Sequence, residues 1–312
     1  MSKRPSLVQQ VSRALHGIAH IGESRHAAKE AGTAPARIHS WESLRSHRQR
    51  SITALRRLND ALPRDQRLQL LRDWRPEHSR QVKALMASDG LSQGFIKNTL
   101  SSLRKLAHAV QAAGWNKLSP EQLVPADLYD GLGQPKPRGG YSPAQAEQII
   151  AHVAGDARHG ETFATMLQLL RSAGLRHTEL ARLRESDLNR ATGEIAVRSA
   201  NAKGGRERLI RLDDAGQERL HEVVNGIPTG RNWLWMDGPS VVRKLQDTVR
   251  EACDDLGIER KGIHAFRALF AEEYLDRRMA EGLSENDARD ALSVVMGHNR
   301  RAVTYRYVPR KS

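Results

Sequence analysis

The sequence is poor in cysteine and in long apolar runs. Cys253 is the only cysteine among 312 residues, so the chain has no internal disulfide, which is typical of a reducing cytoplasm. No run approaches the roughly twenty apolar residues of a membrane-spanning helix, and the basic N-terminus lacks the apolar core of a signal peptide. We therefore expect a cytoplasmic protein without membrane contact, in which Cys253 packs within a helix.

Metal-binding and nucleotide-binding motifs are also missing. The chain contains no HExxH, no paired CxxC and no GxxxxGK[ST] loop, the patterns of zinc proteases, structural zinc sites and P-loop NTPases. We therefore expect neither a metal nor a cofactor.

Acidic residues are scarce relative to basic ones. Fifty Lys and Arg against 36 Asp and Glu give a net charge of +14. Residues 1–140 hold 23 basic and 11 acidic residues, whereas residues 141–312 hold 27 and 25. Because phosphate contacts drive most non-specific affinity for DNA, the front part is expected to bind nucleic acid. Ribosomal and chromatin-type basic proteins share this charge, so charge alone does not indicate an enzyme.

The length allows two domains, each with its own core. Residues 1–36 show only a weak helical pattern and are interpreted as an N-terminal extension, either flexible or ordered on DNA. Residues 37–115 predict a compact helical domain. Residues 116–140 hold four prolines and four glycines, which predicts a linker, and residues 141–312 predict a second domain.

Capping residues mark the expected helices. Ser40 caps one helix, Pro76 begins the next, and Ser92 caps a third that ends at Gly114. In the second domain, Ser142 and the proline after it begin another helix. Basic residues of the front domain and the linker are the candidate DNA contacts: Arg45, Arg48, Lys97, Arg104 and Lys136.

Two short strands interrupt the helices of the second domain. Glu194–Ser199 and Arg208–Leu212 are joined by a segment whose glycines supply a turn. The rest of this domain has helical patterns. The sequence thus predicts a mainly α fold with a small antiparallel β-sheet, an α+β class.

Polar residues at helical spacing are the candidates for chemistry. In GIHAFRALFAEEYL, the apolar stripe through Phe266 leaves His264 and Arg267 pointing together away from the core. Arg176 begins another helix, and Glu179 lies one turn further on, where a carboxylate can orient the guanidinium for phosphate recognition. Taken singly, such pairs are more typical of a solvated helix face or an ordinary ion pair.

Three further candidates complete the set. Lys203, in a glycine-flanked turn, carries a mobile ammonium, although lysines in turns are usually only solubilising. His298 is followed by two tyrosines, Tyr305 and Tyr307. Because residues two apart in a helix point about 200° apart, only one tyrosine can face a site shared with the histidine.

In their order along the chain, these residues resemble the signature of the tyrosine recombinases, the phage-integrase and Xer-type superfamily. The resemblance covers residues 141–307 by motif and residues 37–114 by likeness to the family's helical core-binding domain. It selects Tyr307, which lies nine residues after the histidine. The matching positions are Arg176 with Glu179, Lys203, His264 with Arg267, Gly297 with His298, and Tyr307.

The resemblance implies DNA cleavage without metal or ATP. Tyr307 would attack a backbone phosphate, leaving a 3′-phosphotyrosyl link and a free 5′-hydroxyl. Arg176 and Arg267 would clamp the non-bridging oxygens, where charge grows in the transition state. Lys203 would protonate the departing 5′-oxygen.

The resemblance also assigns supporting roles and partners. His264 would be the base or proton manager, His298 a hydrogen-bond donor to the phosphate, and Glu179 the residue that holds Arg176. Double-stranded DNA with a specific site, assembly of two to four protomers and an accessory DNA-bending protein are the implied partners. The implied function is a site-specific recombinase, the integrase of a mobile element. A Xer-like resolvase, a type IB topoisomerase-like enzyme and a catalytically silent DNA-binding protein stay open as alternatives.

Two features depart from the family pattern. The gap of 31 residues between Arg267 and His298 is longer than expected, and the segment AEGLSENDARDA, residues 280–291, is interpreted as an added turn or helix extension. Only Val308–Ser312 follow Tyr307. We therefore expect protomers to dock without the C-terminal helix that many relatives pass to a neighbour.

Overall fold

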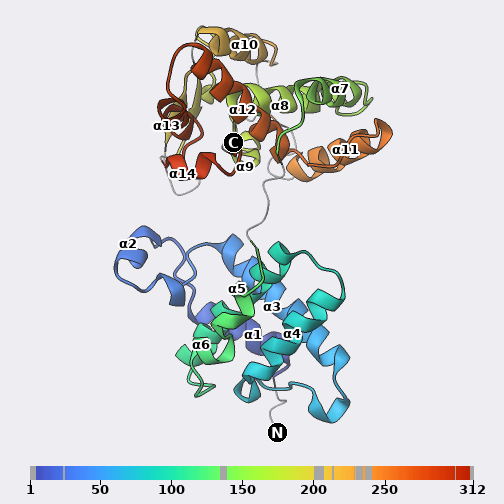
Figure 1. Ribbon diagram of the computed structural model, residues 1–312, viewed down its shortest axis with the longest axis vertical. Helices are drawn as coiled ribbons and strands as arrows, with labels where there is room; N and C mark the ends of the chain where they lie inside the picture. The colour runs from blue at the N-terminus through green and yellow to red at the C-terminus, as the bar shows by residue number, and fades with distance from the viewer. Residues whose placement is uncertain are drawn as a thin grey trace. The chain divides into compact units, whose positions relative to one another are not determined.

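The chain folds into two units, Met1–Pro135 and Lys136–Ser312, each with its own hydrophobic core. This computed structural model describes residues 5–23, 25–133, 139–199, 207–212, 214–227, 229, 235, 241–298 and 300–309. The two units are called unit 1 and unit 2 and are described separately (Figure 1).

Unit 1 is helical throughout its described part. Four longer helices build it, and α3 and α5 pack against each other and against α1 (Figure 1). These helices are α1 (Leu7–Gly17), α3 (Trp41–Ala61), α4 (Pro76–Ser88) and α5 (Gln93–Ala112). Shorter segments are α2 (Arg25–Glu30), α6 (Pro120–Leu123) and the 3-10 turns Ala34–Ala36, Arg64–Gln66, Leu71–Asp73 and Ala126–Tyr129.

The capping residues identified from sequence begin these helices as predicted. The Ser40 side chain accepts a hydrogen bond from Ser43 N, and the Ser92 side chain accepts one from Phe95 N. Each bond satisfies a backbone donor that the first helical turn leaves without a partner. Helix α4 starts at Pro76, whose missing N–H is not needed there.

Residues 5–23 and 25–36 belong to unit 1, which differs from the extension expected over residues 1–36. Val11 and Leu15 of α1 are fully buried in the core. The Gln10 side chain accepts a hydrogen bond from Leu71 N and donates one to Gln69 O, both at 3.0 Å. The segment with the weak helical pattern thus forms a helix of the unit 1 core. Buried apolar contacts stabilise this helix more than its intrinsic helix propensity does.

The segment between the units is shorter than the linker expected over residues 116–140. Asn116 donates to three backbone carbonyls near Trp74, and Leu123 and Val124 of the α6 region are fully buried in unit 1. The proline-rich composition predicted a linker, but here Pro120 begins a capped helical turn.

Unit 2 is mainly helical with one small sheet, which confirms the fold class. Helix α8 packs against α7, α10 and α12 (Figure 1). The helices are α7 (Pro143–Ala154), α8 (Gly160–Ala173), α9 (His177–Leu180), α10 (Asp214–Asn225), α11 (Val241–Asp255), α12 (His264–Ala280), α13 (Glu285–Val295) and α14 (Arg301–Thr304), with a 3-10 turn at Glu185–Asp187. The strands are β1 (Ile195–Val197) and β2 (Arg208–Ile210).

The two strands pair antiparallel and are shorter than predicted. Ile195 pairs with Ile210, and both side chains are buried in the core of unit 2. Cys253 is also buried there, 3.4 Å from the hydroxyl of Tyr141, which confirms its packing role. In the part of the chain that is described, no helix is long and apolar enough to cross a membrane.

Candidate active site

Arg176 is placed by the end of one helix and the start of the next. Gly174 ends α8 with a φ of +57°, a left-handed conformation that glycine adopts without strain. Arg176 then caps α9, and its backbone N–H donates to Glu179 Oε2 at 2.8 Å. Its guanidinium donates to Glu179 Oε1 and, at 3.1 Å, to Gly297 O. Glu179 therefore fixes both the backbone and the side chain of the arginine.

Glu179 is fully buried and is shared with a second arginine, Arg208 of β2. The Arg208 guanidinium donates to Glu179 Oε1 at 3.0 Å and to Oε2 at 2.7 Å. Burial raises the pKa of Glu179, but the hydrogen bonds and charge of Arg208, together with Arg176, outweigh it and hold the pKa at about 2.

Sequence reasoning missed Arg208, although strand alternation contained a signal. Arg208 and Ile210 point to the same face of β2 because side chains alternate along a strand. Ile210 is buried, so the Arg208 side chain on the same face needs a buried partner for its charge. That partner is Glu179, which lies 29 residues earlier in the chain.

Arg267 is fully buried, whereas the sequence predicted a side chain that points away from the core. Its guanidinium donates to the backbone carbonyl of Gly174 and, at 2.8 Å, to that of Met296. Helix α12 packs against both α8 and α13, so the face opposite its apolar stripe is covered as well. His264, one turn earlier, is exposed at the end of the same helix.

His298 joins the two arginines to Tyr307. Its Nδ1 lies 3.4 Å from Arg176 Nη2, and its Nε2 lies 3.2 Å from Arg267 Nη2. The same Nε2 lies 3.3 Å from the hydroxyl of Tyr307, and Arg267 Nε donates to that hydroxyl at 3.4 Å. Arg267 and His298 thus both contact the phenol oxygen of Tyr307, and Arg176 lies against the other ring nitrogen of His298.

Both histidines beside Tyr307 are held neutral at pH 7. Burial, followed by the charges of Arg267 and Arg176, lowers the pKa of His298 to about 3. Partial burial and the Arg267 charge lower that of His264 to about 4, even though the residue is exposed at the surface. The His264 ring centre lies 5.6 Å from that of Tyr307. A neutral imidazole can accept a proton from a phenol.

The two tyrosines of the C-terminal segment face different partners. The ring of Tyr305 lies against the guanidinium of Arg289, 4.1 Å from its carbon to the ring centre. The Tyr307 hydroxyl contacts Arg267 and His298. The two tyrosines lie in the turn that follows α14 rather than in a helix, and Tyr307 stays the predicted nucleophile. Lys203 and Lys136 lie outside the described residues.

The remaining candidate DNA contacts lie in unit 1 and do not share one environment. Arg45 is exposed, and Lys97 is half-buried. Arg48 donates to a serine hydroxyl of α1 at 2.7 Å. Arg104 stacks on Tyr129, with 4.8 Å between its guanidinium carbon and the ring centre. Arg48 and Arg104 thus have partners within the fold.

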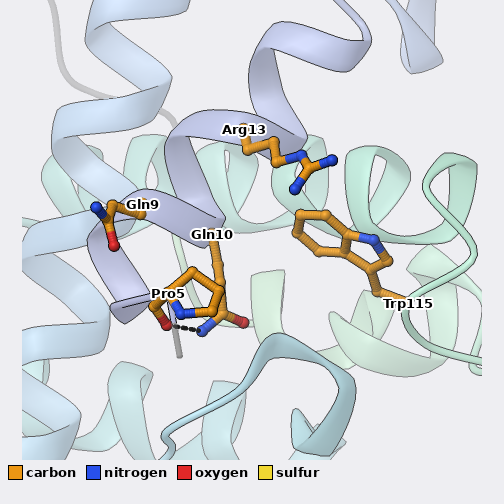
Figure 2. A pocket seen from close by; sticks show the side chains of 5 residues that line it. All are labelled: Pro5, Gln9, Gln10, Arg13 and Trp115. Carbon is orange, nitrogen blue, oxygen red and sulfur yellow. Dashed lines mark hydrogen bonds between the residues drawn. The ribbon is translucent and has the colours of Figure 1, made fainter. Parts of the chain in front are cut away.

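Unit 1 has a cavity of about 580 Å³ whose lining includes neither the residues around Tyr307 nor the candidate DNA contacts. The cavity lies along α1 and is bounded on one side by Trp115 and Arg13 (Figure 2). Gln9, Gln10 and Pro5 complete its lining, with Gln10 Nε2 donating to Pro5 O at 3.0 Å. The lining offers one charge and no nucleophile, so the cluster around Tyr307 is the candidate active site.

Comparison with known proteins agrees with this geometry. A family model described as the phage integrase family matches residues 141–311, which include every residue of the cluster. The chain belongs to the phage integrase family. This integrase-family chain is similar to tyrosine recombinase XerD of Caulobacter vibrioides, with 28% identity over 204 residues, 61% of this chain and 65% of that protein. The match thus spans less than two thirds of that relative's length.

Solved structures share the fold of this integrase-family chain. A lambda integrase dimer bound to a COC′ core site aligns with a TM-score of 0.67 and 15% identity, covering 99% of this chain and 79% of that one. The Tn1549 transposon integrase in complex with circular intermediate DNA aligns with a TM-score of 0.61 and 18% identity, covering 97% and 96%. At such low identity the likeness concerns the fold alone.

Proposed function

We propose that this protein is a site-specific DNA recombinase that cleaves and rejoins DNA through a 3′-phosphotyrosyl intermediate. The observation that carries the proposal is the position of the Tyr307 hydroxyl, 3.3 Å from His298 Nε2 and 3.4 Å from Arg267 Nε. A phenol held against a guanidinium and a neutral imidazole can lose its proton and attack a bound phosphate. Membership of the phage integrase family supports the same chemistry.

The proposed step exchanges one phosphate ester for another. The Tyr307 oxygen forms a bond to phosphorus, and the bond from phosphorus to the 5′-oxygen breaks. The tyrosyl proton passes to a neutral imidazole: His298 lies within hydrogen-bond distance in the free protein, and His264 packs beside the same ring. Lys203 supplies a proton to the departing 5′-oxygen. Because an ester is kept, the reverse reaction rejoins the strand without ATP.

Arg176 and Arg267 would stabilise the charge that develops on the non-bridging oxygens. Both guanidiniums are already fixed by the protein: Arg176 by Glu179, and Arg267 by the carbonyls of Gly174 and Met296. These contacts hold the two guanidiniums in fixed orientations. An incoming anion would also offset the charges that keep His298 neutral, so its pKa should rise on binding, and it could then donate to the phosphate.

Duplex DNA carrying a specific site is the proposed substrate, bound by two to four protomers. The lambda integrase structure is a dimer on a core site, and the Tn1549 protein is a transposon integrase bound to DNA. These two integrases support integration or excision of a mobile element. A cytoplasmic location and an accessory DNA-bending protein are further parts of the proposal. A Xer-like resolvase is the neighbouring possibility within the same chemistry, supported by the similarity to XerD.

A catalytically silent DNA-binding protein on the same fold is not favoured. Such a protein has no need to keep two arginines, a histidine and a tyrosine in mutual contact, or to bury a carboxylate that orients one of them. Buried charged groups are costly unless they are paired or functional.

A nicked suicide substrate tests the proposal. Loss of the short fragment beside the scissile phosphate traps the covalent intermediate. The protein should then form a protein–DNA adduct that survives denaturation, and Tyr307→Phe should form none. Absence of an adduct with the unmodified protein on DNA carrying its own site would overturn the proposal.

A further inference from the structure

We propose that Arg289 of α13 is a positioning residue. It holds the C-terminal segment, residues 304–309, which carries Tyr307, against α13 within unit 2. The proposal rests on the proposed function, because it assigns to Arg289 the placement of the nucleophile. Arg289 lies in the residues 280–291 that lengthen the gap between Arg267 and His298. Ser284 caps α13 and places Arg289 in the second turn of that helix.

The Arg289 guanidinium contacts the residues on both sides of Tyr307. It lies on the ring of Tyr305, two residues before the nucleophile. Its Nη1 donates to Val308 O at 2.9 Å, and its Nη2 donates to Pro309 O at 3.3 Å. The arginine thus contacts the chain two residues before Tyr307 and at the two residues after it, and the hydroxyl of Tyr307 faces Arg267 and His298.

A third contact fixes the turn from which Tyr307 projects. Arg289 Nη1 lies 3.4 Å from the hydroxyl of Thr304, which is fully buried. The carbonyl of Thr304 in turn accepts the N–H groups of Tyr307 and Val308, both at 3.0 Å. Arg289 therefore acts on the backbone geometry that sets the direction of the tyrosine.

Burial makes this attachment hard to reverse. The Arg289 side chain is only 2% exposed, whereas that of its carboxylate partner Glu285 is 45% exposed. If the C-terminal segment detached, the guanidinium would keep Glu285 and lose three oxygen acceptors and an aromatic face. These contacts are formed away from water, and together they favour the docked position of the segment before DNA binds.

The matched control is a solvent-exposed ion pair between α13 and α14. Helices α13 and α14 lie side by side (Figure 1), and Asp290 pairs with Arg301 of α14. The side chains of this pair are 51% and 39% exposed. Exposed ion pairs contribute little, so Asp290→Asn removes a neighbouring contact without disturbing the buried one.

Two readouts test the proposal in the full chain. Arg289→Gln should raise amide hydrogen exchange across residues 304–309 at least about tenfold and leave α8 unchanged. It should lower the rate of adduct formation on the nicked substrate by at least about tenfold at saturating protein, with the DNA Kd within about twofold. Arg289→Lys keeps the charge and loses the planar fork. In both readouts it should give values between those of the unmodified protein and those of Arg289→Gln. Asp290→Asn should change either readout by less than about twofold.

The outcomes separate this proposal from the proposed function. If the unmodified protein forms no adduct, the recombinase proposal fails, and the exchange data alone decide whether Arg289 holds the segment. Unchanged exchange at residues 304–309 in Arg289→Gln overturns the proposal. A uniform rise in exchange that includes α8 also overturns it, because Arg289 would then be a general core residue.

Discussion

Among single residues, Glu179 pairs with two arginines at the site. It is fully buried and accepts hydrogen bonds from both Arg176 and Arg208. Removal of one partner from a buried charged network leaves the other charges without compensation. The carboxylate therefore matters for stability as well as for orienting Arg176.

We expect Glu179→Ala to lower the free energy of unfolding by about 3–5 kcal/mol, because two guanidiniums lose their buried carboxylate. The control is Glu147→Ala. Glu147 pairs with Arg171, but its side chain is 68% exposed, and Arg171 keeps Glu273 as a partner. That change should cost less than about 1 kcal/mol. Urea denaturation at pH 7 measures both, and equal losses would contradict the central place of Glu179.

His298 should make folding stability depend on pH. Its pKa is about 3 in the folded protein, against an ordinary value of 6.5. Between these values the unfolded chain binds the proton and the folded one does not, so stability falls as the pH drops below 6.5. His298→Gln should reduce the loss of unfolding free energy between pH 7 and pH 4.5 by about 1–2 kcal/mol. An identical loss in both proteins would contradict the low pKa.

The sequence allowed prediction of most residues of the site but not of how they are held. Arg176, His298 and Tyr307 follow from spacing and family resemblance, and the structure brings them together. The burial of Arg267 could not be read from its helix, because the covering atoms come from residues near Gly174 and Met296, which are far away in sequence. Periodicity reports which faces of one helix differ, not which distant segment covers them.

At the scale of elements, the short connection between α8 and α9 sets the geometry around Arg176. Gly174 has a left-handed backbone, its carbonyl accepts from Arg267, and a Cβ added there would lie 2.3 Å from the ring of Phe270. This glycine therefore satisfies both a backbone requirement and a packing requirement.

We expect Gly174→Ala to lower the free energy of unfolding by more than about 2 kcal/mol, because conformational strain and a steric clash add. Gly90→Ala is the matched control. Gly90 follows α4 with a φ of +68°, and a Cβ there would meet nothing within 4 Å. It should cost only about 1 kcal/mol. Thermal and urea unfolding compare the two variants, and equal costs would contradict the role assigned to Phe270.

The elements themselves were predictable where strong local signals coincide with burial. The helices after Ser40, Ser92 and Ser142 have capping serines and begin where expected. Helix α1 also has a capping box, formed by Ser6 and Gln9. Its packing was not predicted, because its docking site is built by residues about sixty positions away, such as Leu71. Composition alone predicted a linker that includes residues 120–123, where the structure has the helical turn α6.

At the scale of the whole molecule, the net charge of +14 should govern non-specific DNA binding. Neutralising several phosphates releases counterions, so the Kd for random duplex DNA should rise at least about a hundredfold between 50 and 200 mM salt. Arg45, which is exposed on α3, is a proposed phosphate contact. Arg45→Gln should lower the slope of log Kd against log salt by about 1, and Arg45→Lys should leave it unchanged. Salt-independent binding would contradict the electrostatic account.

The central claim is that Tyr307 becomes covalently joined to DNA. The most direct measurement is mass spectrometry of the adduct from the nicked substrate, after nuclease and protease digestion. The account predicts the nucleotide remnant on the tyrosine of residue 307, with Tyr305→Phe still forming the adduct. A remnant on Tyr305, or an adduct that persists in Tyr307→Phe, would contradict it.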